Sequence, residues 1–528
     1  MRNLHFPGKS NVISTQGMAA TSQPLSSLEA ISILKKGGNA VDAAIAASAV
    51  QAVIEPGSTG IGGDSFAIIS LKNKKPVSVN GSGIAAKKLT LDFLNEKKID
   101  KISITSPHSV TIPGSVHAWY SMHNKFGKLD FEELFITAEK YARNGYPVHE
   151  VSAQSWEQNI NKIIKNEYTK RIFSKNGKPY KFGEIHKNIN LANTLNSIAK
   201  NNIKDFYHGY IADDIVDTLN EFGGVQSFED FESQKTIFSD TIHNNYKDNT
   251  IHQCPPNGPG ITVLIMMAIL DKFNFKNFEP MSFERFHLQA EATKLAYEAR
   301  EKVIGDPSFS EFNISQLISE KFIDDLAANI SFEKCYNPVN FTITAHPETI
   351  YLTVVDKDLN AVSLINSICF PFGSGITSKK TGILLQNRGV NFRILKDHPN
   401  NIEGHKRPLH TIIPGLVLDK NNQNLLSFGV MGGQYQPVGQ CQVLQNIFDF
   451  KMNIQQAIDF PRAFNIEGEY KFEKTFPREI IEKLNNVGHN VSYSNGPHGG
   501  GQAIYINDNE GIMIGGSDSR KDGCAIGY

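Results

Sequence analysis

Two groups late in the sequence are of a type that performs acyl transfer. Thr349 stands directly before the β-type run Ile350 to Val355 and offers a hydroxyl nucleophile. Gly432 and Gly433 end an apolar run, and their adjacent N–H groups can point at one oxygen because glycine tolerates unusual backbone angles. Each signal alone is weak, since a threonine at a strand start is usually structural and a glycine pair is usually a turn.

Both groups stand at the ends of predicted strands. Residues 350–355 and 361–365 are mostly β-branched or aromatic, and Asp356 to Asn360 between them reads as a tight turn, so we predict a hairpin. Gly415 to Leu418 is a further predicted strand, and Ser427 to Pro437 is predicted to be a strand that ends in the glycine pair. These strands would position the candidate groups.

The first part of the chain reads as mostly helical. The run from Asn39 to Pro56 is rich in alanine and nearly free of charge, which indicates a buried helix. The glycine-rich stretch Gly57 to Phe66 lacks the Lys and Ser/Thr pair of a phosphate-binding loop, so that interpretation is weak. Two amphipathic helices are predicted in Thr111 to Tyr146, and Val148 to Asn249 reads as an outer helical layer.

The segment that begins at Thr349 resembles the processing site of the γ-glutamyltranspeptidase family. The matching positions are Thr349, Thr353, Val354, Val355, Asp356, Asn360, Ala361 and Val362, with Leu359 where the family usually has glycine. The stretches G-G-N-A-V-D-A-A and E-P-x-x-T-G-I-G-G near the N-terminus resemble the family's other signature, and the resemblance runs from Gly17 to Tyr528.

The resemblance implies a fold, a maturation step and a set of catalytic residues. The fold would be the four-layer αββα sandwich of N-terminal-nucleophile hydrolases, an α/β class. Self-cleavage between Glu348 and Thr349 would give a large subunit, residues 1–348, and a small subunit, residues 349–528. The new α-amine, with an ordinary pKa of about 7.7 to 8.0, would be the general base for its own hydroxyl. Ser367 would position the nucleophile, and Gly432 and Gly433 would hold the oxyanion.

Four further residues are expected to bind the substrate: Arg388, Asn391, His410 and Thr411. In γ-glutamyl enzymes an acid stands at the position of Asn391 and two serines stand at those of His410 and Thr411. The segment Asn80 to Ala86 also lacks their arginine. Because Arg388 would repel an ammonium group and attract a carboxylate, the pocket suits a small carboxylate-bearing amide, as in the family's oxamate amidohydrolase and cephalosporin acylase branches.

Composition limits the partners. Lys and Arg total 53 against 54 for Asp and Glu, so a nucleic-acid or anionic-membrane surface is not expected and a small molecule is. Five scattered cysteines suggest neither a disulfide framework nor a zinc site, and no cofactor or metal is expected. The first residues lack the apolar run of a secretory signal, which predicts a cytoplasmic protein. A homodimer of heterodimers is left open.

Two alternatives accompany the amidohydrolase interpretation, in which hydrolysis is favoured over transpeptidation. The first is a true γ-glutamyltranspeptidase or glutathione hydrolase. The second is an inactive binding protein of the same fold, against which the presence of Thr349, Ser367 and both glycines speaks. Near the C-terminus, the mixed-charge run Asp518 to Asp522 is expected to be a solvated turn.

Overall fold

The predicted hairpin lies at the centre of one of two stacked sheets. The computed structural model describes residues 8–337, 349–466 and 468–528. Strand β10 (Ile350–Val355) pairs with β11 (Ala361–Ser367) in an antiparallel register, and both strands are buried along their whole length. The hairpin prediction is confirmed.

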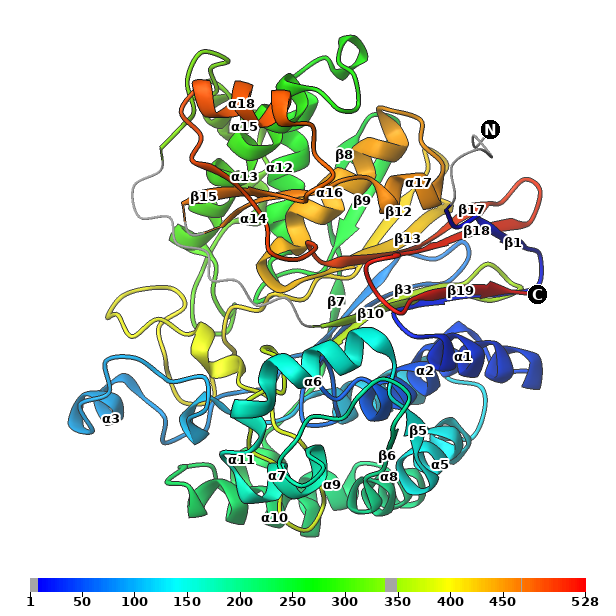
Figure 1. The fold of residues 1–528 in the computed structure, drawn as a ribbon, viewed down its shortest axis with the longest axis vertical. Helices are drawn as coiled ribbons and strands as arrows, with labels where there is room; N and C mark the ends of the chain where they lie inside the picture. The colour runs from blue at the N-terminus through cyan, green and yellow to red at the C-terminus, as the bar shows by residue number, and fades with distance from the viewer. Residues whose placement is uncertain (1–7, 338–348, 467) are drawn as a thin grey trace.

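Each of the two large sheets has seven strands among the described residues. The first runs in the order β1 (Val12–Ser14), β18 (Ile512–Ser517), β17 (Gly500–Asn507), β13 (Asn424–Met431), β12 (Gly415–Leu418), β9 (Asn249–Gln253) and β8 (Ile242–Tyr246). The second runs in the order β19 (Cys524–Gly527), β2 (Met18–Thr21), β10, β11, β3 (Asp64–Ser70), β4 (Val77–Gly81) and β7 (Ile237–Asp240). The two sheets lie face to face (Figure 1).

The core between the sheets is mostly apolar, with a few polar contacts such as the hydroxyl pair Thr353 and Ser427. Phe66 and Tyr351 from the second sheet pack with Leu416, Met431 and Ile504 from the first. At roughly 25 cal/mol per Å² of apolar surface removed from water, this inner layer is a main source of the free energy that holds the sheets together. Side chains of the two sheets therefore pack against each other at β10.

Helices cover the two outer faces (Figure 1). One layer contains α1 (Pro24–Lys36), α2 (Ala40–Ile54), α4 (Ser115–Phe126), α5 (Ile136–Asn144), α6 (Glu150–Ile163), α7 (Glu167–Phe173), α8 (Ile189–Asn201), α9 (Lys204–His208), α10 (Tyr210–Glu221) and α11 (Phe228–Glu232). The other contains α12 (Gly260–Asp271), α13 (Phe283–Val303), α14 (Ile314–Leu317), α15 (Glu320–Ala327), α16 (Gln436–Phe448), α17 (Ile454–Asp459) and α18 (Arg478–Asn486). Together with the sheets they form the predicted αββα sandwich.

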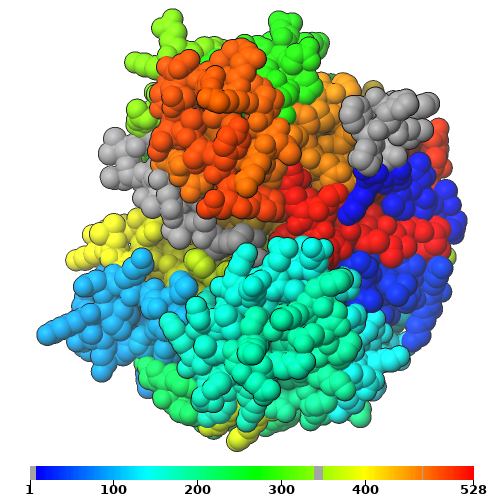
Figure 2. All heavy atoms as spheres, viewed as in Figure 1, coloured from blue at the N-terminus to red at the C-terminus, as the bar shows by residue number. Residues whose placement is uncertain are grey.

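Smaller elements complete the chain. They are α3 (Leu91–Glu96), the pair β5 (Tyr146–Pro147) and β6 (Ile185–His186), and the small sheet β14 (Ala463–Ile466), β15 (Glu469–Phe472) and β16 (Val491–Tyr493). In the space-filling view the C-terminal residues, in red, reach the surface between the orange and the cyan parts of the chain (Figure 2). No described helix is both long and apolar enough to cross a membrane.

The sequence predicts only some of the strands. Those expected after Thr349 are present, but β1 to β4 and β7 to β9 all come from the first 348 residues and complete both sheets. The concentration of strands in the C-terminal part is therefore less marked than the sequence suggests. Several of the early strands are short or lack a regular alternation of polar and apolar residues, and their partners are distant in the chain.

Asp356 joins the hairpin turn to the start of α2. Its buried carboxylate accepts hydrogen bonds from the backbone N–H groups of Ala40, Asp358 and Asn360, at 3.0 to 3.1 Å. The turn also holds Leu359 at φ +60°, where a family member with glycine would meet no steric resistance. The carboxylate thus helps to hold the predicted turn although Leu359 takes a left-handed conformation in it.

Replacing Asp356 with Ala should lower the free energy of unfolding by about 3 kcal/mol or more, because several buried donors lose a charged acceptor. Urea denaturation followed by circular dichroism measures the change. Asp358→Ala is the matched control, since Asp358 is exposed and its N–H is unaffected. Equal losses in the two variants would contradict this role for Asp356.

Candidate active site

The hairpin register brings Thr349 and Ser367 together. Ile350 pairs with Asn366, so the residue before β10 lies beside the last residue of β11, and the Thr349 Oγ1 to Ser367 Oγ distance is 3.2 Å. Both side chains are buried. Ser367 Oγ also accepts hydrogen bonds from Cys369 N–H (2.9 Å) and Arg388 Nη2 (3.0 Å).

These contacts assign the direction of the hydroxyl bond. A serine oxygen has two lone pairs and one proton. Cys369 and Arg388 occupy both lone pairs of Ser367, so its proton points at Thr349 Oγ1. Thr349 therefore accepts this bond, and its own hydroxyl proton is not used in it. A donor aimed at the threonine oxygen stabilises negative charge that develops there.

The glycine-rich stretch after α2 packs beneath this pair. A Cβ on Gly63 would lie 2.2 Å from the Ser367 carbonyl oxygen, and one on Gly62 would lie 2.2 Å from that of Leu384. Asn366 Nδ2 donates to Thr59 Oγ1 and the Gly60 carbonyl. The glycines thus serve close backbone approach under β11, which fits the expectation that they do not form a phosphate loop.

Arg388 is a buried cation beside the predicted nucleophile. It begins the short helix η4 (Arg388–Asn391), and its guanidinium donates to Ser367 Oγ and, at 2.7 Å, to Thr411 Oγ1. Its side chain is fully buried. Among the described residues no carboxylate lies within ion-pair distance of it, and Nε has no hydrogen-bond acceptor. The structure thus brings Arg388 and Thr411 to Thr349 and Ser367.

His410 faces the protein interior. Its Nδ1 accepts from Ile412 N–H (3.3 Å), so Nε2 carries the proton and donates to the carboxylate of Asp64 at 3.0 Å. Burial, with the nearby Arg388 charge, lowers the pKa of His410 to about 4, and the Asp64 contact opposes that shift. Both ring nitrogens are therefore used by the protein, and His410 is neutral at ordinary pH.

Asp64 is the residue of this site that the sequence analysis missed. Its carboxylate is fully buried and accepts from Gly83 N–H (2.9 Å), Gln386 Nε2 (2.8 Å) and His410. Asp64 is paired with Ser367 across β3 and β11. The available signal was an acid placed directly between a glycine turn and an apolar strand, where an uncompensated charge would be costly.

Asn391 lies at the wall of a cleft of about 440 Å³. Its Nδ2 donates to the Leu409 carbonyl at 3.1 Å. The cleft is also lined by Phe370, Leu409 and Gln434, which are near neighbours in sequence of Ser367, His410 and Gly433. Arg388, which contacts Ser367, is fully buried and is not among the residues that line the cleft. The cleft therefore adjoins the predicted catalytic residues in sequence without being lined by them.

The glycine pair has the backbone angles that the oxyanion hypothesis requires. Gly432 has φ +127° and Gly433, the first residue of η5 (Gly433–Tyr435), has φ +58°. In the turn and cap hydrogen bonds between described residues, neither N–H group is a donor. Their role stays a prediction, and the other half of the proposed cleavage site, Glu348, lies outside the described residues.

One group of described residues has the types and spacing of metal ligands: His287, Glu291 and His489. His287 Nε2 donates to the Ser331 carbonyl, so His489 Nε2 donates to His287 Nδ1 at 2.9 Å. Lys294 Nζ lies 2.7 Å from the Glu291 carboxylate. This ion pair and the ring-to-ring hydrogen bond account for the ligand atoms; His287 and Glu291 lie on α13, His489 follows α18, and none of the three lines the cleft.

The layers and the hydroxyl at the start of a central strand define an N-terminal-nucleophile hydrolase fold. A crystal structure of a cephalosporin acylase from Bacillus halodurans matches with a TM-score of 0.94 and 34% identity, covering 100% of this chain and 99% of that one. The family model of γ-glutamyltranspeptidase matches residues 26–528. The chain belongs to the γ-glutamyltranspeptidase family, which confirms the resemblance and the fold predicted from the sequence.

Two proteins that are similar to this chain carry different names. The glutathione hydrolase-like YwrD proenzyme of Bacillus subtilis is 35% identical over 98% of this chain and 99% of its own length. The oxamate amidohydrolase proenzyme of Klebsiella pneumoniae is 27% identical over 98% of this chain and 100% of its own length. Both comparisons span nearly the whole of each protein.

The low pKa of His410 predicts a specific acid sensitivity. The folded-state value of about 4 lies below the ordinary 6.5, so stability from neutral His410 is present above about pH 6.5 and is lost as the pH falls toward 4. At about 1.4 kcal/mol per pH unit, the loss is about 2 kcal/mol by pH 5. In His410→Gln, whose Nε2 still donates to Asp64, the loss of stability between pH 7 and pH 5 should be smaller by that amount. Urea unfolding at both pH values tests this, and an identical pH dependence would exclude it.

Proposed function

We propose that the chain is a precursor that cleaves itself between Glu348 and Thr349 and then hydrolyses a small amide that carries a carboxylate. The word proenzyme in the names of both relatives supports a large subunit, residues 1–348, and a small one, residues 349–528. The names hydrolase and amidohydrolase support water as the acceptor. Thr349 would be the nucleophile of an acyl-enzyme mechanism.

The observation that carries the substrate class is the environment of Arg388. Its buried guanidinium has only neutral hydroxyl partners, Ser367 and Thr411, at ion-pair or hydrogen-bond distance among the described residues. A buried cation without a paired anion is unfavourable, and a substrate carboxylate would supply the anion. Arg388 lies two hydrogen bonds from Thr349 Oγ1, so this carboxylate would be only a few bonds from the scissile carbonyl.

The proposed reaction uses these groups in the following way. Thr349 Oγ1 attacks the amide carbonyl, and its proton passes to the α-amine that self-cleavage has freed. Negative charge on the carbonyl oxygen is held by the N–H groups of Gly432 and Gly433. The tetrahedral intermediate expels the leaving amine, which takes up that proton, and water then hydrolyses the ester on Thr349. The Ser367 hydroxyl donates to Thr349 Oγ1 during attack and release.

The two candidate substrate classes differ in whether the α-carbon carries an ammonium group. A γ-glutamyl substrate carries an ammonium group there, and Asn391 offers an amide where an acid would be needed. One relative is nevertheless named glutathione hydrolase-like, so a γ-glutamyl substrate is the second candidate. An inactive binding protein of the same fold would give no turnover with either substrate and no cleavage.

Self-cleavage predicts two fragments from one chain. Purified protein should separate under denaturing conditions into two bands whose masses sum to 58.5 kDa. Thr349→Ala should remain whole because the attacking hydroxyl is gone, and Thr349→Ser should still be cleaved. Mass spectrometry of the small fragment should find Thr349 at its N-terminus. An active protein that stays a single chain would overturn the mechanism.

Substrate choice predicts faster hydrolysis of glutaryl than of γ-glutamyl p-nitroanilide. One charge-assisted hydrogen bond is worth roughly 1.5 to 3 kcal/mol, so the ratio of kcat/KM should be about tenfold to a hundredfold. Butyryl p-nitroanilide, which has the same chain length to within one atom but no carboxylate, should be slower by a similar factor. A preference for the γ-glutamyl compound would restore the ordinary transpeptidase assignment.

Arg388→Met separates two roles of the arginine. If Arg388 binds the carboxylate, the glutaryl compound loses its advantage over the butyryl compound. If Arg388 acts only by holding Ser367, both substrates slow equally and their ratio stays unchanged. The second result would remove Arg388 from substrate recognition.

A further inference from the structure

The glycine pair rests on a second glycine-rich segment, residues 498–501. A Cβ on Gly432 would lie 2.9 Å from Gly499 Cα, and one on Gly499 would lie 2.2 Å from the Met431 carbonyl oxygen. Gly500 pairs with Met431 at the end of β13. The positions of Gly432 and Gly433 therefore depend on where the backbone of residues 498–501 lies.

Charged side chains hold that segment at both ends. Glu473 accepts from His498 N–H (3.1 Å), and Arg462 donates to the His498 carbonyl (2.8 Å). Asp518 accepts from Gly501 N–H (2.6 Å), and its own N–H donates to the Gly501 carbonyl (3.0 Å). The His498 ring stacks on Tyr435, the last residue of η5, with centroids 5.5 Å apart.

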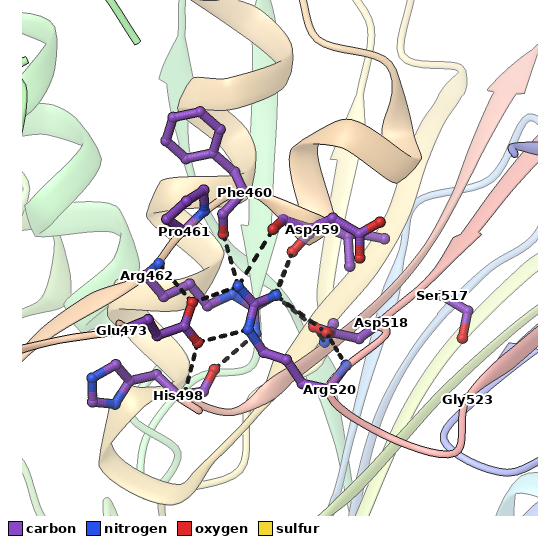
Figure 3. A network of polar contacts seen from close by, with 12 residues as sticks. Asp459, Phe460, Pro461, Arg462, Glu473, His498, Ser517, Asp518, Arg520 and Gly523 are labelled. Atoms are coloured by element: carbon purple, nitrogen blue, oxygen red, sulfur yellow. Dashed lines mark hydrogen bonds and ion pairs between the residues drawn. The ribbon is translucent and has the colours of Figure 1, made fainter. Parts of the chain in front are cut away.

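The charges that hold the segment bind one another. Arg462 lies 2.7 Å from Asp518, and Arg520 lies 2.6 Å from both carboxylate oxygens of Glu473 and 3.3 Å from Asp518. Figure 3 shows the Arg520 guanidinium between the two acids, with His498 beside Glu473. We call Arg462, Glu473, Asp518 and Arg520 the brace. Its charges balance, two positive and two negative.

The brace corrects one expectation from the sequence. The run Asp518 to Asp522 was expected to be a solvated turn, but Asp518 is fully buried and the Arg520 side chain is only 13% exposed. The two arginines hold the pKa of Asp518 below its usual range despite burial. Partners far away in sequence, at 462 and 473, make this burial favourable, so the run alone gave no sign of it.

We propose that the brace is a positioning device for the oxyanion hole: through His498, Gly499 and Gly501 it fixes the N–H groups of Gly432 and Gly433 where negative charge develops. The proposal rests on the proposed acyl-transfer function. Each brace residue acts through the segment 498–501, and none is placed at the substrate. Loosening the brace should raise the energy of the tetrahedral state and leave the binding of planar ligands nearly unchanged.

Asp518→Asn tests this, because it removes the charge and one acceptor while keeping the side-chain shape. The processed enzyme should lose about tenfold or more in kcat with little change in KM. Affinity for 4-boronobutanoate, whose boron becomes tetrahedral on the nucleophile, should fall by a similar factor. Affinity for glutarate, which stays planar, should change less than about twofold. Arg462→Lys keeps the charge but cannot reach all its acceptors, and should show a smaller effect of the same pattern.

Asp214→Asn is the matched control. Asp214 is also a buried carboxylate that accepts from backbone N–H groups, those of Lys380 and Thr381, but it lies on α10 in the opposite helical layer. It should lower thermal stability without changing the ratio of boronate to glutarate affinity. If the two aspartate variants behave alike, the brace serves stability only and the proposal is wrong.

Two further outcomes are distinguishable. If wild-type protein prefers γ-glutamyl over glutaryl anilide, the proposed substrate fails, but kcat on the preferred anilide still measures the brace. If Asp518→Asn and Arg462→Lys both melt normally yet are never cleaved, the brace serves self-cleavage, and its proposed role in the mature oxyanion hole is overturned.

Discussion

The register between β10 and β11 is the constraint on which the site depends. It places the residue before β10 beside Ser367 and allows the hydroxyl contact of 3.2 Å. A slip of one residue would turn every side chain of these buried strands to the other face, so the two cores that flank the sheet hold the register in place. Asp356 at the turn and the glycines under β11 act on the same alignment.

The site and its surroundings also contain several buried charged residues. Asp64 and His410 form a contact in which the histidine is neutral, while the Arg388 guanidinium lies among hydroxyl groups. The brace balances its four charges internally. Only at Arg388 does a described buried cation beside the predicted nucleophile lack a carboxylate partner. Arg285 is also buried without an ion-paired carboxylate among the described residues, so only the neighbouring Thr349 and Ser367 distinguish Arg388 as a candidate for ligand binding.

The sequence predicts those parts of the structure that depend on residues close together in the chain. The hairpin, the buried helix α2 and the strand before Gly432 follow from composition and periodicity over short windows. The fold and the catalytic set came from the family resemblance around Thr349. Asp64 was not predicted, and the run from Asp518 was assigned to solvent, because the partners that make their burial favourable are far away in the chain. His410 was placed at the substrate, yet its tautomer depends on Ile412 and Asp64, which only the folded chain brings to it.

Under the proposed function, the residues of the reaction and those of substrate recognition lie on different elements, except at one residue. Thr349 directly precedes one central strand, Ser367 ends another, and Gly432 and Gly433 follow a third, where packing from both helical layers limits change. Asn391, Leu409 and Gln434 line the cleft from short connections, which tolerate substitution more easily. Arg388 belongs to both sets, because it starts the η4 turn at the cleft and donates to Ser367. Under the proposed function, a change in carboxylate recognition at this position would also alter the hydroxyl that supports the nucleophile, so a change of specificity at Asn391 should cost the reaction less than one at Arg388.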